Sequence, residues 1–110
     1  MENKTNIEIA AEMKKYAEEN VIELPNVNWA GVDGYRKTMK VKDKEVCVIF
    51  THDVMFGRPH KHLSMSIDSK PIEDKEIIDE IKSLFYDKAE KVHSLPGALL
   101  NNSSQFLAYE

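Results

Sequence analysis

Residues 45–51, EVCVIFT, form an almost unbroken apolar run that is rich in β-branched side chains. Such a run is typical of a strand buried on both faces, so we expect a central strand of a sheet. The preceding residues 35–42, YRKTMKVK, alternate between polar and apolar side chains, as strands do. Because the polar turn VKDKE separates the two segments, the pattern predicts a β-hairpin.

Two further segments have the periodicity of helices. Residues 5–20 begin with Thr5 and Glu8 at the spacing of a capping box, and apolar residues follow at helical intervals. Ser69 and Pro71 predict the start of a second helix, since proline is favoured in the first helical turn. The apolar stripe of that helix consists of Ile77, Ile78, Ile81, Leu84 and Phe85.

The remaining elements are short strands and loops. Strands are predicted over 60–67, 89–94 and 104–109, and loops over 21–34, 53–59 and 95–103. The order α, β, β, β, α, β, β predicts an α+β fold, with an antiparallel sheet of about five strands and helices packed on one face. We expect a single domain over residues 1–110, in which 1–34 supply the first helix and a loop and 35–110 supply the core.

Composition restricts the class of protein. The chain has 110 residues and a net charge of −4, which argues against non-specific binding to nucleic acids or to anionic membranes. Its single cysteine, Cys47, cannot form an internal disulfide and suits a reducing cytosol. The polar N-terminus lacks the apolar region of a signal peptide, and no apolar run approaches the ~18 residues of a membrane span. We therefore expect a cytoplasmic protein without a membrane partner.

The third predicted strand lies in the stretch RPHKHLSMS, residues 58–66. Side chains alternate across a sheet, so Leu63, Met65 and Ile67 should face the helices. The opposite face would then carry His60, His62, Ser64 and Ser66. With helices on one side only, we expect this polar row to face water, a ligand or a second subunit.

Three interpretations of the polar row remain open. It could be the solvated face of an ordinary antiparallel sheet. It could bind a metal through His60 and His62, although no cysteine pair or H-E-x-x-H helix accompanies them; further ligands would come from His52, Asp53, Asp68 and His93. His62 and Ser64 also have the H-x-S form of two-histidine phosphoesterases, which need a second such motif that this chain lacks.

Other side chains could complete a binding site around the row. Arg58 precedes it and could clamp a phosphate or carboxylate, although a surface salt bridge is the more common role. An aromatic ring beside a loop can stack on a base or close the edge of the core, and an amide can read a ligand edge or turn a hairpin. The aromatic candidates are Trp29, Tyr35 and Phe56, and the amides are Asn101 and Asn102.

The stretches GRPHKHLSMSI, SLFYD and KVHSLP, with Pro71 before the acidic helix and a short final strand, resemble a family of small proteins encoded largely by phages and prophages. The resemblance covers about residues 35–110. That family has a strand of the form W/H-x-H-x-S-x-S, a proline-led helix, a strand ending in proline and an Asn-containing turn. Here Pro59 and His60 replace the usual tryptophan region, and the common tryptophan after Pro71 is missing. Transfer of residues is therefore restricted to His62, Ser64 and Ser66.

The resemblance implies a viral context, in which small acidic proteins counter host defence. We expect a binding protein that sequesters a nucleotide-type immune signal without cleaving it, without a metal or cofactor, as a homodimer or higher homo-oligomer. A protein–protein inhibitor of a host defence protein is the alternative, and a phosphodiesterase-like enzyme using His62 is the third. The acidic positions that favour the inhibitor are Glu73, Asp74, Glu76, Asp79 and Glu80.

Overall fold

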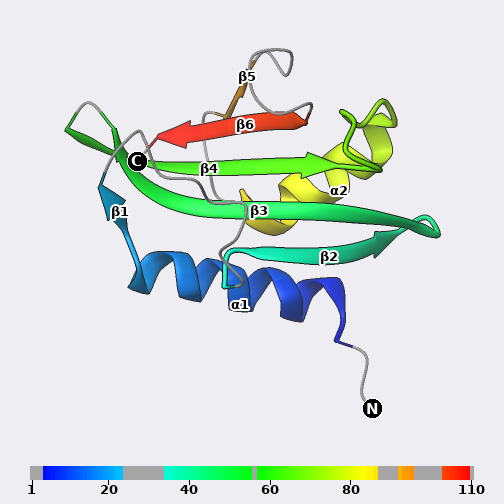
Figure 1. Ribbon diagram of the computed structural model, residues 1–110, viewed down its shortest axis with the longest axis horizontal. Helices are drawn as coiled ribbons and strands as arrows, with labels where there is room; N and C mark the ends of the chain where they lie inside the picture. Colours follow the sequence, from blue (N-terminus) through cyan, green and yellow to red (C-terminus); the bar gives the residue numbers. More distant parts are fainter. Residues whose placement is uncertain (1–3, 24–33, 56, 87–91, 96–102, 110) are drawn as a thin grey trace.

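The predicted hairpin is present in the computed structural model, which describes residues 4–23, 34–55, 57–86, 92–95 and 103–109 (Figure 1). Its strands, β2 (Arg36–Val41) and β3 (Lys44–Met55), pair antiparallel. The turn residues Lys42 and Asp43 have φ angles of 53° and 63°, in the left-handed region that two-residue hairpin turns require. β3 has neighbours on both sides, so the prediction of a central strand is confirmed.

The rest of the sheet builds outward from β3. On one side follow β4 (Arg58–Ser66), β6 (Ser104–Tyr109) and β5 (Val92–Leu95), and each is antiparallel to its neighbour. On the other side β2 shares β3 with the two-residue β1 (Ile22–Glu23), which runs parallel to it. The described sheet therefore has six strands, and the final strand lies where it was predicted.

Both helices pack on the same face of this sheet (Figure 1). α1 (Asn6–Glu19) begins with the predicted capping box between Thr5 and Glu8. α2 (Lys75–Phe85) buries the predicted stripe through Ile77, Ile81 and Phe85. Helix and sheet residues form one core, whose fully buried members include Met13, Met39, Val46, Val48, Phe50, Leu63, Met65, Ile77 and Ile81.

Several predicted boundaries were wrong. The loop expected over 53–59 is much shorter, because the ladder between β3 and β4 continues from the Cys47–Ser66 pair to the Met55–Arg58 pair. Gly57, with a φ of 74°, lies in the tight connection that remains. β4 consequently spans 58–66 rather than 60–67, and the loop expected over 21–34 contains β1.

The start of the second helix was also wrong. Asp68 and Ser69 have positive φ angles and form a tight turn. Ile72 is buried in a segment without regular secondary structure, and its backbone N–H donates to Ser104 Oγ at 2.9 Å. The chain therefore cannot enter a helix at Pro71, and Asp74 caps α2 instead. The coarse prediction holds: the chain has an α+β fold with two helices on one face of a mainly antiparallel sheet.

Candidate functional site

The face of the sheet turned away from the helices carries a group of buried polar side chains, which we call the polar layer. Its members come from β3, from β4, from β6 and from Ser103 just before β6, and the strand residues share one face because side chains alternate along each strand. Every buried polar residue of the described chain belongs to it. They are Thr51, Asp53, His60, His62, Ser64, Ser103 and Gln105.

Hydrogen bonds connect one half of the polar layer across two strands. The ring nitrogen Nε2 of His62 lies 2.8 Å from Gln105 Oε1. Gln105 Nε2 donates to Ser103 Oγ at 3.0 Å, and Ser64 Oγ donates to the same oxygen at 2.9 Å. The chain from His62 to Ser64 is thus continuous, and buried networks of this kind hold their members in one arrangement.

The other half of the layer is centred on a carboxyl group. Asp53 is 2% exposed and lies directly opposite His60 in the ladder between β3 and β4. Thr51 Oγ1 donates to Asp53 Oδ2 at 3.1 Å, whereas Asp53 Oδ1 has no hydrogen-bond partner among the described residues. Burial raises the pKa of Asp53 above its usual value, while the Thr51 hydrogen bond and the neighbouring histidines oppose that rise.

The buried position of His62 favours the neutral form of its imidazole. Burial lowers its pKa below the usual value, and the hydrogen bond to Gln105 only partly offsets this effect. A neutral ring offers one donor and one acceptor nitrogen rather than a positive charge. Together with the hydroxyl groups and the Gln105 amide, this gives a surface that can exchange directional hydrogen bonds with a polar, uncharged group.

The predicted polar row exists, but its environment differs from the prediction. We expected His60, His62 and Ser64 on an open face, and this was wrong: they are 2%, 7% and 8% exposed. Ser66, opposite Cys47 in the ladder, is half-buried at the less enclosed end of the same face. The polar row is therefore part of the folded interior and not a solvated sheet surface.

Tyr35 does not belong with this row. It lies beside Phe50 on the helix-covered face, is 3% exposed and donates its hydroxyl hydrogen to the carbonyl oxygen of Asn20. A ring in that position closes the core and cannot stack on a ligand at the polar layer. The sheet separates them.

Some predicted site residues fall outside the described structure. These are Trp29, Phe56, Asn101 and Asn102. Arg58 is the first residue of β4, and His93 lies in β5, but neither side chain is described. Within the described part of the chain, no group of three His, Cys, Asp or Glu side chains is placed to hold a metal ion.

Three members of the polar layer were missed as partners of the histidines. They are Thr51, Ser103 and Gln105, whereas Asp53 was considered only as a metal ligand. Each lies directly opposite a layer residue or two positions along the strand from one, so the strand register was the missing information. The alternation T-x-D over 51–53 and S-x-Q over 103–105 is the only local signal.

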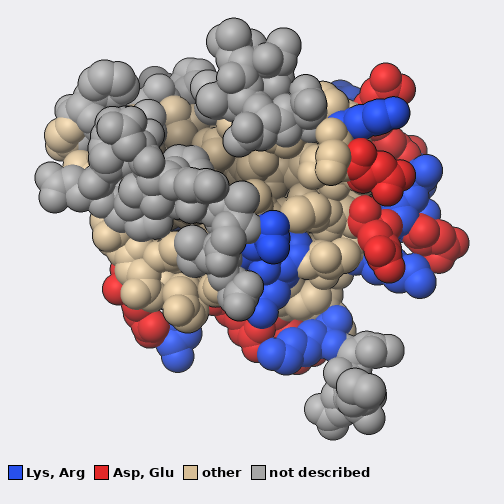
Figure 2. Space-filling model, in the orientation of Figure 1, with Lys and Arg blue, Asp and Glu red and all other residues tan. Residues whose placement is uncertain are grey.

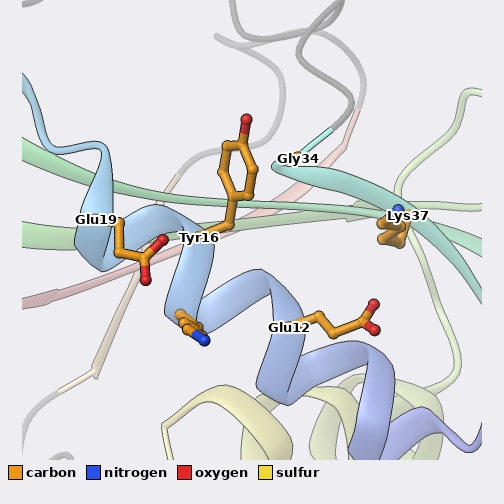
Figure 3. A pocket seen from close by; sticks show the side chains of 6 residues that line it. Glu12, Tyr16, Glu19, Gly34 and Lys37 are labelled. Atoms are coloured by element: carbon orange, nitrogen blue, oxygen red, sulfur yellow. The ribbon is translucent and has the colours of Figure 1, made fainter.

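A separate shallow groove lies between α1 and β2 (Figure 3). Tyr16 stands beside Gly34 in it, and acidic and basic side chains line its length. Lys37, which faces this groove, is opposite Val48 and therefore on the helix side of the sheet. The groove is thus distinct from the polar layer.

The acidic start of α2 is partly neutralised. Lys42, in the β2–β3 turn, contacts Asp74 at 3.0 Å and Glu76 at 3.1 Å. Figure 2 shows acidic and basic side chains intermixed at the end of the molecule where that turn lies. These ion pairs are exposed, so each contributes little to stability, but they break up the acidic surface that the inhibitor alternative requires.

Comparisons with protein-family models, with curated proteins and with solved structures found no match. None of the helices in the described ranges is both long and apolar enough to span a bilayer. The fold and the polar layer are therefore the observations from which a function can be argued.

Proposed function

We propose that the protein binds a nucleotide-type ligand at the polar layer and sequesters it without cleaving it. One observation carries this proposal: the buried polar side chains of the described chain all gather on one sheet face. Burying a polar group costs free energy that an apolar side chain would avoid. The polar layer concentrates this free-energy cost on three adjacent segments of the sheet. We infer that its polar side chains serve a function, and ligand recognition is the function that we favour.

The chemistry of the layer suits the base or sugar of a nucleotide. His62 and Gln105 offer nitrogen and oxygen atoms in fixed directions, and the layer's hydroxyl groups can either donate or accept. The oxygen Oδ1 of Asp53 is an acceptor that no described residue uses, and the exocyclic amino group of a base would satisfy it. Because these side chains are buried, binding requires the protein to open toward the ligand or to close around it.

The proposed biological role is sequestration of an immune signal in a cell infected by a phage. This part rests on the resemblance of residues 35–110 to small phage and prophage proteins. Sequestration requires binding without turnover, and the single H-x-S motif at His62 and Ser64 lacks the second histidine motif of two-histidine phosphoesterases. An assay for cleavage of the bound nucleotide separates this role from the enzymatic alternative.

Calorimetric titration tests the proposal. The probes are cyclic AMP, cyclic di-AMP, cyclic GMP and ADP-ribose, and chromatography of each mixture checks for products. We expect at least one probe to bind with a Kd below ~100 µM, about −5.5 kcal/mol, and to be recovered intact. Absence of binding at that level would overturn the proposal, and product formation would favour the enzyme.

A matched pair of variants locates the site. Ser64→Ala removes a hydroxyl from the polar layer, whereas Met65→Leu changes the next residue of β4 on the helix-covered face. We expect the first to weaken binding about fivefold or more, as loss of a ~1 kcal/mol hydrogen bond does, and the second to leave it unchanged. Equal effects of the two variants would place the ligand elsewhere.

The protein–protein inhibitor is tested by charge reversal on α2. Asp79 and Glu80 are exposed and lie outside the Lys42 ion pairs. Their replacement by lysine should leave nucleotide binding intact if the polar layer is the site. Loss of defence inhibition in an infection assay, with nucleotide binding retained, would favour the inhibitor instead.

A further inference from the structure

The helix-free face of the sheet has two parts with different chemistry. The polar layer occupies the part near β4 and β6 and contains no lysine or arginine among its members. Toward β2 the same face becomes more open: Ile49, Cys47 and Ser66 are half-buried, and Arg36, Thr38 and Lys40 are exposed. The face therefore runs from an enclosed region without lysine or arginine to an open edge that carries positive charge.

Strand register aligns these two parts. Arg36 lies opposite Ile49, Ile49 lies opposite Ser64, and Ser64 lies opposite Gln105. This row crosses four neighbouring strands on one face. Because neighbouring strands are ~4.8 Å apart, the backbones at Arg36 and Ser64 are separated by about 10 Å. A nucleotide that placed its base or sugar at Ser64 would extend its phosphate by a comparable length.

Arg36 is the better placed of the two cations on this edge. Lys40 lies directly opposite Glu45, so an acidic residue occupies the neighbouring position in the ladder. Arg36 instead faces the apolar Ile49 and forms no ion pair within the described ranges. A guanidinium can bind two phosphate oxygens at once, which an ammonium group cannot do with the same geometry.

We infer that Arg36 binds the phosphate of the ligand whose base or sugar occupies the polar layer, with Ile49 packing between the two ends. This inference rests on the proposed function and adds to it a residue that the sequence pattern did not indicate. It explains how a buried layer without lysine or arginine can belong to a site for an anionic ligand. The anion stays at the exposed edge, where desolvation costs little, and only uncharged groups enter the interior.

The neighbouring residue offers a matched control. Lys37 is exposed on the same strand, but alternation turns it to the helix side and into the groove between α1 and β2. Arg36→Gln and Lys37→Gln remove one positive charge each, one position apart, on opposite faces of β2. A general electrostatic effect should change binding equally in the two variants, whereas a phosphate contact should respond only to the first.

The experiment measures the Kd values of cyclic AMP, cyclic di-AMP and ADP-ribose, with adenosine as the uncharged comparison, for the full chain and both variants. We expect Arg36→Gln to weaken nucleotide binding about fivefold, Lys37→Gln to change it by less than about twofold, and neither to affect adenosine. Added salt should weaken nucleotide binding to the unsubstituted protein more than to Arg36→Gln. Coinciding urea unfolding curves would verify that both variants are folded.

Two results would contradict the account, and they are distinguishable. In the first, the unsubstituted protein binds these nucleotides while Arg36→Gln and Lys37→Gln change the Kd equally. The proposed phosphate contact of Arg36 is then wrong, but the polar layer can still be the binding site. If the unsubstituted protein binds none of the nucleotides, the proposed function fails, and the role of Arg36 fails with it.

Discussion

At the scale of single residues, two buried side chains of the polar layer make the stability of the fold depend on pH. His62 and Asp53 are both almost fully enclosed, and burial disfavours the charged form of each. For the histidine this lowers the pKa, and for the aspartate it raises the pKa. Acidification therefore acts on stability in opposite directions at these two positions.

His62 should make the protein less stable as the pH falls. Its pKa in the folded state is below the ordinary value of 6.5, so the unfolded chain takes up the proton first. We expect the free energy of unfolding to decrease between about pH 8 and about pH 5, and His62→Gln to lose part of that decrease. Urea unfolding at several pH values measures it. An unchanged pH dependence in the variant would show that His62 is not the titrating group.

For Asp53 we expect the opposite dependence of stability on pH. Its pKa in the folded state is raised above 3.8, so its burial is tolerated best when the carboxyl group is protonated, and stability is lost as the pH rises through the raised value. Asp53→Asn keeps the shape and removes the charge. We expect the variant to gain stability relative to the unsubstituted protein as the pH rises, by chemical denaturation. A relative loss at high pH would mean that the carboxylate has a stabilising cationic partner.

We predict that position 34 requires glycine because the Tyr16 ring leaves no space for a side chain, and not because of the backbone conformation of Gly34. A Cβ atom there would lie 2.3 Å from the ring of Tyr16, which packs edge-on against Tyr35 at 5.4 Å between centroids. We expect Gly34→Ala to displace the half-exposed Tyr16 ring and to cost about 1 kcal/mol. The same substitution in a Tyr16→Ala background should cost much less. Equal costs in the two backgrounds would indicate backbone strain at Gly34 instead.

At the scale of the elements, short sequence patterns were sufficient to predict those helices and strands whose structure is determined by contacts between neighbouring residues. The capping box of Thr5 and Glu8, the stripe of α2 and the alternation of β6 are each contained in a few neighbouring residues. The start of α2 was predicted incorrectly because a long-range contact, from Ile72 to Ser104, holds the preceding segment outside the helix. Sequence spacing alone does not contain such a contact.

The capping box gives a test of an individual element. Thr5 Oγ1 accepts from the Glu8 backbone N–H at 3.2 Å, so Thr5→Ala leaves that donor without its intramolecular partner. We expect a loss of about 1 kcal/mol in the free energy of unfolding. Lys15→Ala, at an exposed position in the same helix, should change it by less than about 0.5 kcal/mol. Similar losses for both would mean that capping adds nothing here.

At the scale of the whole molecule, the face of the polar row was predictable and its burial was not. Alternation along RPHKHLSMS separates His62 and Ser64 from Leu63 and Met65, and the structure confirms that division. Burial depends on the whole folded chain, which the periodicity of one strand does not report. The partners Asp53 and Gln105 likewise required the register of three strands. The homodimer remains a prediction, for which analytical ultracentrifugation is the direct measurement.

Nucleotide binding at the polar layer is tested most directly by observing both faces of β4 in one experiment. Side-chain NMR signals of His62, in the polar layer, and of Met65, in the helix-covered core, are followed while cyclic di-AMP or ADP-ribose is added. If the nucleotide binds at the polar layer, we expect saturable shifts of the His62 ring signals, while the Met65 methyl signal stays nearly constant. A nucleotide that binds while shifting Met65 and leaving His62 unchanged would contradict binding at the polar layer.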